Sequence, residues 1–184
     1  MEAFYPGAKQ IIFVGPTGGS YVGAPFRGVI HTTQSVSYTP SKFEYYGHSN
    51  PPHFTVAKSA NGARVFQHYS IKVAARALAN ADGGVQTNRQ NAIQIEIAWR
   101  AENIAALPLP MKDALRALIR WISRECNIQR RAPPFLGHEA FGSGSAARME
   151  FEEWNSFNGW CGHQHVPENV HWDPGKIDIA YLLG

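Results

Sequence analysis

Residues 92–98 read Ala-Ile-Gln-Ile-Glu-Ile-Ala, a strict alternation of apolar and polar side chains. Because successive side chains of a β-strand point to opposite faces, this pattern predicts a strand with its isoleucines on one face and with Gln94 and Glu96 on the other. From Met111 to Cys126 the apolar residues instead recur at steps of three and four, which predicts an amphipathic helix that begins near Pro110. A strand and a helix of this kind favour a mixed α/β fold.

Other patterns complete the expected fold. The clearest is a hairpin, with strands at 53–57 and 63–67 joined through the turn Ala60-Asn61-Gly62. Residues 71–79 fit a short helix, although their apolar and partly β-branched composition leaves a strand or a loop open. The remaining expectations are short buried strands at 9–14 and 27–31, a helical turn at 41–46, a long surface excursion at about 130–147, and short helices at 149–157 and 176–183.

The composition points to one hydrophobic core. The chain has 184 residues, of which 44% are hydrophobic, so residues 1–184 are expected to form a single domain. No run approaches the roughly 18 apolar residues of a membrane helix, and the first residues lack the basic and apolar regions of a secretory signal, so we expect neither membrane insertion nor export. Two cysteines, Cys126 and Cys161, are too few for a disulfide scaffold, and a single bridge between them is left open.

Residues 161–175 read Cys-Gly-His-Gln-His-Val-Pro-Glu-Asn-Val-His-Trp-Asp-Pro-Gly, a segment without helical or strand periodicity. It carries three histidines and Asp173. Imidazole nitrogen and carboxylate oxygen are the ligands of catalytic zinc sites, where three protein ligands leave one position open for water. The segment therefore indicates a metal site, and its composition leaves open which residues bind.

An upstream histidine completes a longer pattern. His31 lies in Gly-Val-Ile-His-Thr-Thr, His163 follows a glycine, and Asp173 stands ten residues after His163 in Asp-Pro-Gly. This arrangement resembles the zinc-dependent N-acetylmuramoyl-L-alanine amidases of the amidase-2 and peptidoglycan-recognition-protein family, and is most similar to the endolysins of phages that infect actinobacteria. The resemblance extends from about residue 25 to the C-terminus.

The resemblance implies an α/β fold with a central mixed sheet flanked by helices. It also implies one Zn²⁺ ion, bound by His31, His163 and Asp173 in a groove at one edge of the sheet. The implied reaction is hydrolysis of the amide between N-acetylmuramic acid and L-alanine, the first residue of the peptidoglycan stem peptide. Such a zinc ion polarises the carbonyl and lowers the pKa of water.

The resemblance assigns catalytic roles to Glu96 and His171. Glu96 occupies the position of the family's strand glutamate, where a carboxylate takes a proton from water and passes it to the leaving amine. From its pattern alone, Glu96 could instead be a solvated residue on an edge strand. His171 stands where members often carry a lysine that stabilises the negative oxygen of the tetrahedral intermediate. Because an imidazole beside Zn²⁺ is charged only at lower pH, we expect His171 to make the activity depend on pH.

His165 competes with His163 as a metal ligand. We favour His163, because it alone follows glycine and has the ten-residue spacing to the aspartate. Two positions depart from the family pattern: a tyrosine of some phage amidases is replaced by Pro52, and a histidine of many members is replaced by Arg76. No acid–base role is therefore expected at Pro52.

Three further residues are expected to contact the substrate. Asn91 and Trp99 flank the strand that carries Glu96, and they would line the groove if that strand ends at the metal. His53 would either line the pocket or serve as a hydrogen-bonded structural residue. The tryptophans around the metal loop are expected to bury it, namely Trp154, Trp160 and Trp172.

The expected partner is peptidoglycan. The net charge of +3 favours anionic partners, but the chain lacks the dense basic stripe with interleaved aromatics of a nucleic-acid-binding protein. The alternative function is a recognition module that binds peptidoglycan without cleaving it, and the complete ligand set favours the enzyme. We expect a monomer that acts on the bacterial cell wall, made in a host cytoplasm and released like a phage endolysin, or delivered by another route.

Overall fold

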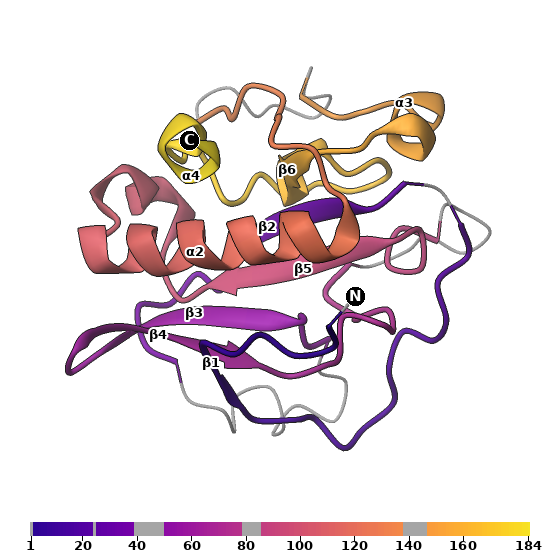
Figure 1. The fold of residues 1–184 in the computed structure, drawn as a ribbon. Helices are drawn as coiled ribbons and strands as arrows, with labels where there is room; N and C mark the ends of the chain where they lie inside the picture. The colour runs from indigo at the N-terminus through magenta and orange to yellow at the C-terminus, as the bar shows by residue number, and fades with distance from the viewer. Residues whose placement is uncertain (1, 24, 39–49, 79–85, 138–146) are drawn as a thin grey trace.

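The computed structural model describes residues 2–23, 25–38, 50–78, 86–137 and 147–184. Within these residues one six-stranded sheet forms the centre of the molecule, in the order β1-β4-β3-β5-β2-β6 (Figure 1). Neighbouring strands are parallel except in the hairpin of β3 and β4. The expected mixed sheet flanked by helices is therefore confirmed.

The strand predicted from the isoleucine alternation lies in the middle of the sheet. It is β5 (Ala92–Ile97), and it pairs in parallel with β2 (Arg27–Thr32) and β3 (Phe54–Ser59). Its three isoleucines are fully buried. Because a central parallel strand is covered on both sides, the alternative of Glu96 as a solvated residue on an edge strand is wrong.

The hairpin is confirmed, whereas the first predicted strand is shorter and more exposed than expected. β3 and β4 (Gly62–Gln67) pair in antiparallel fashion, and Gly62 takes the positive φ of 102° that the turn requires. β1 (Ala8–Gln10) ends early because its partner β4 ends at Gln67. Ile12 is 44% exposed and Val14 is 100% exposed, so the expectation of a buried strand over 9–14 is wrong.

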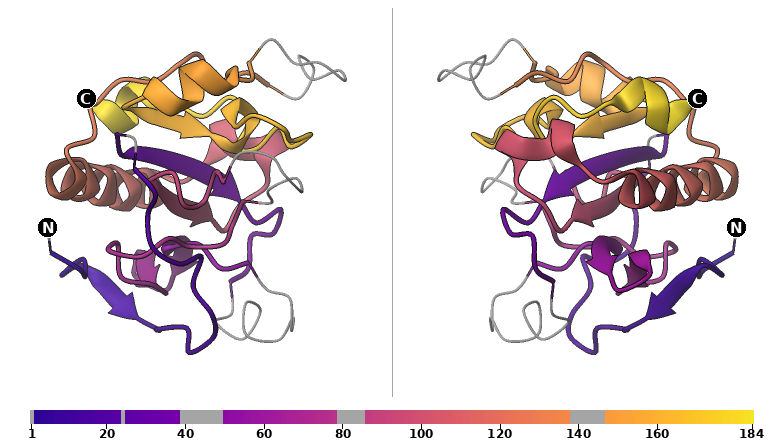
Figure 2. Two further views of the ribbon diagram at one scale, coloured as in Figure 1. Left: turned by 90° about the vertical axis from the view of Figure 1, so that its right-hand side faces the viewer. Right: turned by 90° about the vertical axis from the view of Figure 1, so that its left-hand side faces the viewer.

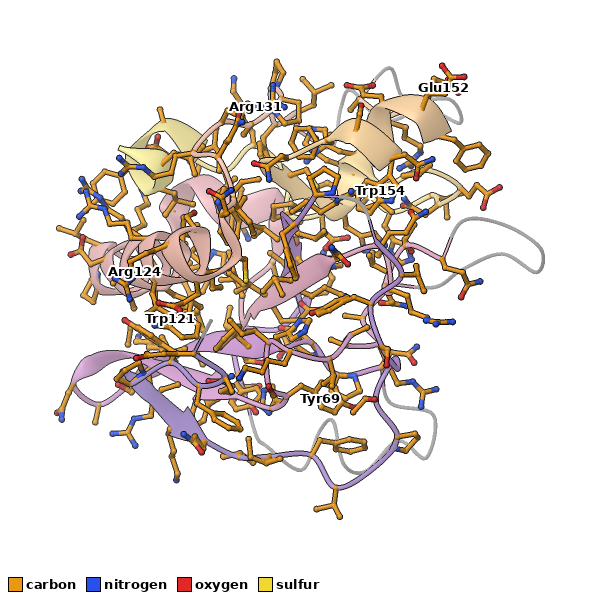
Figure 3. The ribbon with its side chains drawn as sticks, turned by 45° about the vertical axis from the view of Figure 1, so that its right-hand side comes forward. Tyr69, Trp121, Arg124, Arg131, Glu152 and Trp154 are labelled. Atoms are coloured by element: carbon orange, nitrogen blue, oxygen red, sulfur yellow. The ribbon has the colours of Figure 1, made fainter. Side chains whose placement is uncertain are left out.

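One helix, α2 (Leu109–Cys126), covers one face of the sheet (Figures 1 and 2). It confirms the predicted amphipathic helix and carries Pro110 in its first turn, where the missing N–H would have no helical partner. Trp121, which is labelled in Figure 3, lies on this helix. It packs between Tyr5 and Phe54, with ring centroids 5.2 Å and 6.2 Å away. The helix buries an apolar stripe against the isoleucines of β5, and each fully buried side chain contributes about 1.5–3 kcal/mol. The stripe consists of Met111, Leu115, Leu118, Ile119 and Ile122.

The opposite face of the sheet is apolar where the strands begin and polar toward their ends. Where β2, β5 and β6 (Trp160–Gly162) begin, a small apolar cluster includes Val29 and Cys161. α3 (Phe151–Ser156) covers it with the fully buried Trp154, which is labelled in Figure 3. The Arg27 guanidinium lies over the Trp154 ring, 4.4 Å from its centroid. Toward the strand ends the same face becomes polar, because it carries His31 and Glu96. The polar end of this face positions the candidate site.

The structure decides two alternatives that the sequence leaves open, in favour of a loop at 71–78 and against a disulfide. Residues 71–78 contain no helix; this segment is irregular, and Ala74 forms an isolated bridge with Gly19. Cys126 and Cys161 are both free, and they lie in separate apolar clusters, so the bridge left open between them is absent.

The two short helices expected near the C-terminus are present but shorter than expected. They are α3 and α4 (Ile179–Leu183). The helical turn expected at 41–46 and residues 138–146 of the expected excursion lie outside the described residues. In the described part of the chain, no helix is long and apolar enough to cross a membrane.

Two buried histidines predict a loss of stability in mild acid. His53 Nδ1 accepts a hydrogen bond from the Gln94 N–H at 3.0 Å, and its Nε2 donates to the Val73 carbonyl at 2.9 Å. Burial lowers the pKa of His53 to about 4 and that of His68 to about 4, against about 6.5 in the unfolded chain. Both are therefore neutral in the fold, and their contribution to stability is complete above about pH 6.5 and is lost as the pH falls toward 4.

We expect the free energy of unfolding, measured in urea, to fall by about 1 kcal/mol per pH unit for each histidine below about pH 6. The slope should be smaller in His53→Gln. An identical slope in this variant and in the parent would contradict the assignment of His53.

Candidate metal centre

Segments far apart in the sequence bring His31, His163 and Asp173 together. His31 is the last but one residue of β2, and His163 opens the 3-10 turn η3 (His163–His165) directly after β6, which pairs with β2. The following loop returns so that the Gln164 N–H donates to the Asp173 carbonyl at 3.0 Å. The Thr32 N–H donates to Asp173 Oδ2, also at 3.0 Å. Strand pairing and these two bonds hold the three side chains in place.

The donor atoms of the three side chains converge. The two Nδ1 atoms of His31 and His163 are 3.2 Å apart, and Asp173 Oδ1 lies 3.3 Å from the latter. The remaining pair, His31 Nδ1 and Asp173 Oδ2, is 3.8 Å apart. Ligands about 2.0–2.1 Å from a tetrahedral zinc ion lie about 3.3 Å from one another. The three buried side chains therefore fit the protein ligands of a zinc ion, and among the described residues they are the group that could hold a metal.

The electrostatic surroundings keep two of the candidate ligands, His31 and Asp173, in the protonation states that a metal needs. Burial, reinforced by the nearby charge of His163, lowers the pKa of His31 to about 3. Burial alone would raise the pKa of Asp173, but the hydrogen bond and charge of His163 and the N–H of Thr32 lower it to about 2. At neutral pH His31 is thus neutral and Asp173 is ionised, which leaves their lone pairs free to coordinate a cation.

A cavity of about 550 Å³ opens beside the three ligands. Glu96 lines it from β5, where it is the register partner of His31, so both side chains lie on the same face of the sheet. Gln34, Asn50 and Ala77 also line the cavity. The sequence reasoning missed these three, because loop residues without a periodic pattern or a chemical motif give no local signal.

His171 lies over the candidate ligand His163. Their rings are stacked, with centroids 4.3 Å apart and planes at 9°, and His171 Nδ1 is 3.9 Å from Asp173 Oδ1. The His171 side chain is 58% exposed and lines the cavity. Partial burial and the neighbouring His163 lower its pKa, so His171 is neutral at neutral pH and can donate one N–H.

His165 points away from the ligands. It is fully buried, its Nδ1 accepts from the Gly162 N–H at 2.9 Å, and its Nε2 donates to the Pro134 carbonyl at 3.1 Å. Both ring nitrogens are therefore occupied by backbone partners. This geometry favours His163 over His165 as the ligand and gives His165 a structural role.

The three expected substrate contacts lie elsewhere. His53 is fully buried, and both of its ring nitrogens are hydrogen-bonded, so the structural role is the one that fits. Asn91 precedes the first residue of β5, at the opposite end of the strand from Glu96, and is 8% exposed. Trp99 packs against the α2 core and donates its indole N–H to the Asn103 carbonyl at 2.9 Å. None of the three is among the described residues that line the cavity.

The metal loop is held by two features. A Cβ atom at Gly162 would lie 2.5 Å from Pro174 Cδ, so the glycine lets the Asp-Pro-Gly segment pack onto the end of β6. Arg148, which the sequence reasoning missed, donates through Nη1 to the carbonyls of Gln164 at 3.2 Å and His171 at 3.1 Å. A lone arginine outside any pattern gives no signal of such a role.

The fold is that of N-acetylmuramoyl-L-alanine amidases. The endolysin amidase LysCS from Clostridium intestinale URNW is 16% identical, with a TM-score of 0.62, and the match covers 98% of this chain and 95% of that one. AmpD matches with 13% identity and a TM-score of 0.61, over 99% and 96% of the two chains. Staphylococcus aureus AmiA matches with 11% identity and a TM-score of 0.61, over 97% and 82%. No protein-family model and no curated protein matches the chain.

Replacing Asp173 tests the ligand set. We expect Asp173→Asn to weaken zinc binding more than about 100-fold, because a ligand contributes more than the outer partners whose loss costs 10–100-fold. Isothermal titration with zinc and metal analysis of the purified protein would measure this. Asp178→Asn, which removes an exposed carboxylate at the start of α4, is the matched control and should bind zinc like the parent. Equal zinc binding by both variants would refute the assignment of Asp173.

Proposed function

We propose that this protein hydrolyses the amide between N-acetylmuramic acid and L-alanine in peptidoglycan, with one zinc ion bound by His31, His163 and Asp173. The observation that carries the proposal is the convergence of three buried donor atoms, 3.2 Å to 3.8 Å apart, beside Glu96 in an open cavity. The fold adds support, because LysCS is an N-acetylmuramoyl-L-alanine amidase.

Glu96 is the proposed acid–base residue. Zinc, when bound, supplies a Lewis acid for the amide carbonyl and lowers the pKa of water toward neutrality. Glu96 faces the same cavity as the ligands, so its carboxylate can accept the proton of the attacking water and then pass it to the leaving amine. Its place on a buried central strand fixes its position relative to His31.

His171 is the proposed donor to the developing oxyanion. Its stacking on His163 places the ring beside the metal ligands, while its exposed edge faces the cavity. A neutral imidazole N–H aimed at the carbonyl oxygen stabilises the negative charge that forms there. The role that family members often give to a lysine can thus be filled without a permanent cation next to the metal.

The alternative is a module that binds peptidoglycan without cleaving it. The presence of all three ligands and of Glu96 in one cavity favours the enzyme. We further propose that the protein acts on the bacterial cell wall as a monomer, released like an endolysin or delivered by another route.

Digestion of purified peptidoglycan tests the function. We expect the protein to release free stem peptides with a new L-alanine amino terminus, detected by mass spectrometry, and to lose this activity with a chelator. Asp173→Asn should be inactive, and added zinc should restore the chelated parent. Binding to peptidoglycan without any cleavage would favour the recognition module, and cleavage of the glycan or activity that resists the chelator would refute the mechanism.

Single substitutions test the two catalytic residues. Glu96→Gln should lower kcat by about 10²–10⁴-fold, since that is the usual contribution of a positioned acid–base group. His171→Ala should lower kcat by about 10²–10³-fold, and His171→Lys should recover part of the loss. Both variants should bind zinc like the parent, and Glu102→Gln on the surface turn η1 (Ala101–Ala106) is the matched control. Near-parental kcat in Glu96→Gln would remove Glu96 from the mechanism.

A further inference from the structure

A cavity of about 450 Å³ lies at the C-terminal end of α2. We name this cavity the arginine pocket, because its described lining holds three arginines and no acidic residue. It is lined by Arg120, Ser123, Arg124, Ile128 and Arg130. The charge of this part of the chain is strongly positive, which makes the pocket a candidate site for an anion.

The arginine pocket lies away from the metal centre. Ser123 contacts Trp160, which pairs with Gly28 near the start of β2, whereas His31 is the last but one residue of that strand. In addition, α2 covers one face of the sheet (Figure 1), and His31 and Glu96 lie on the other face. An occupant of the arginine pocket would therefore leave the metal cavity open to a second ligand.

Two guanidinium groups converge at the arginine pocket. Arg120 Nη2 donates to the main-chain oxygen of Gly184 at 2.6 Å, and Arg130 Nη1 donates to the same oxygen at 3.4 Å. Among the described residues, neither group forms an ion pair with a carboxylate side chain. Each guanidinium has five N–H donors, so most of these donors are available to a ligand. Because two cations that share one acceptor repel each other, an anion bound between them would be stabilised.

The acidic residues nearest to the pocket in sequence are engaged with other groups. Glu125 pairs with Arg124, whose Nη2 lies 3.0 Å from Glu125 Oε1. Asp113, near the start of α2, accepts a hydrogen bond from the Tyr181 hydroxyl. These contacts offset the charge of Arg124 and leave the charges of the other two arginines of the pocket.

A buried hydroxyl also lines the arginine pocket. Ser123 is 8% exposed, and its Oγ accepts a hydrogen bond from the Trp160 indole N–H at 2.9 Å. Because an indole N–H can only donate, the Ser123 hydroxyl still has its own proton to donate. The structure gives this proton no acceptor among the described residues. A buried hydroxyl donor beside free guanidinium donors distinguishes a built anion site from a merely charged surface.

The surroundings favour a phosphate group on a polymer over a membrane surface. Helices that lie on membranes carry large exposed apolar side chains beside their cations. Between residues 110 and 131, all of which the structure describes, no large apolar side chain is exposed. The pocket is instead a cavity that a single anionic group can enter, and planar guanidinium groups match the oxygens of a phosphate.

We propose that the arginine pocket binds a phosphate group of an anionic phosphodiester polymer of the bacterial cell wall, and thereby holds the protein on the wall. The choice of a wall polymer rests on the proposed function, whereas the phosphate site itself rests on Arg120, Arg130 and Ser123. Attachment at this pocket raises the concentration of the metal cavity near its substrate without blocking that cavity.

Binding of fluorescently labelled poly(glycerol phosphate) to the full chain, measured by fluorescence anisotropy, tests the pocket. Polyglutamate of the same length carries carboxylates in place of phosphates, and phosphatidylglycerol vesicles carry phosphodiesters on a membrane. Arg120→Gln/Arg130→Gln removes two charges, Arg120→Lys/Arg130→Lys keeps both charges without the planar forks, and Ser123→Ala removes the hydroxyl. The matched control is Lys58→Gln/Arg64→Gln, which removes two exposed charges from β3 and β4.

We expect the glutamine pair to bind poly(glycerol phosphate) at least about tenfold more weakly than the parent, as is usual for loss of charge-assisted hydrogen bonds. The lysine pair and Ser123→Ala should each lose part of the affinity, while the control should bind like the parent. The parent should bind polyglutamate and the vesicles more weakly than poly(glycerol phosphate).

Three results would overturn the proposal. If the control weakens binding as much as the glutamine pair does, or if the lysine pair binds like the parent, the attraction depends on total charge and the pocket is refuted. Equal binding of polyglutamate would refute the phosphate site, and tighter binding to the vesicles would refute the choice of a wall polymer. Circular dichroism checks the fold of Ser123→Ala, and the lysine pair decides the matter if that variant does not fold.

Digestion of cell walls separates this proposal from the proposed function. Poly(glycerol phosphate) contains no amide, so Asp173→Asn should bind it like the parent. The glutamine pair should digest walls that carry the phosphate polymer more slowly than the parent, and walls stripped of it at the parental rate. If the parent cleaves peptidoglycan but the glutamine pair binds the polymer normally, the pocket alone is refuted. If the parent binds the polymer through the pocket but cleaves nothing, the pocket stands and the proposed hydrolysis falls.

Discussion

The parallel alignment of β6, β2 and β5 is the constraint on which the site depends. Parallel strands present their carboxyl ends at one edge of a sheet, so His31 on β2 and Glu96 on β5 reach the same cavity as register partners. β6 ends at Gly162 opposite Ile30, and His163 therefore emerges beside His31. A slip of one residue would turn His31 to the apolar face under α2. The isoleucine layer that fixes the register thus also fixes the site.

Because the site is buried, the charges of its side chains must be balanced by partners within the protein. A buried carboxylate is stable as an ion only if hydrogen bonds and positive charge offset its lost hydration. Asp173 receives the Thr32 N–H and lies against two imidazoles, and a divalent cation would complete this balance. Arg148 and Gly162 hold the loop that carries two of the candidate ligands, His163 and Asp173. His171, the proposed oxyanion donor, is more exposed.

Much of the fold could be predicted because its signals are local. The alternation around Glu96 and the helical repeat from Met111 to Cys126 are visible in short windows of sequence. Asn91 and Trp99 were misplaced for the same reason: they are next to Glu96 in sequence, but Asn91 lies at the far end of the strand and Trp99 turns into the α2 core. Adjacency along a strand does not show which side chains face a cavity, because that depends on what packs against each end.

The sequence by itself indicates a metal site, and the resemblance carried by His31, His163 and Asp173 selects the candidate ligands without coordinates. The sequence leaves open how the loops pack against the sheet. The packing of distant segments turns His165 into the structure and brings the Trp160 indole against Ser123 at the arginine pocket. Those placements arise from contacts between residues far apart in the chain, and such contacts leave no periodic trace in the sequence.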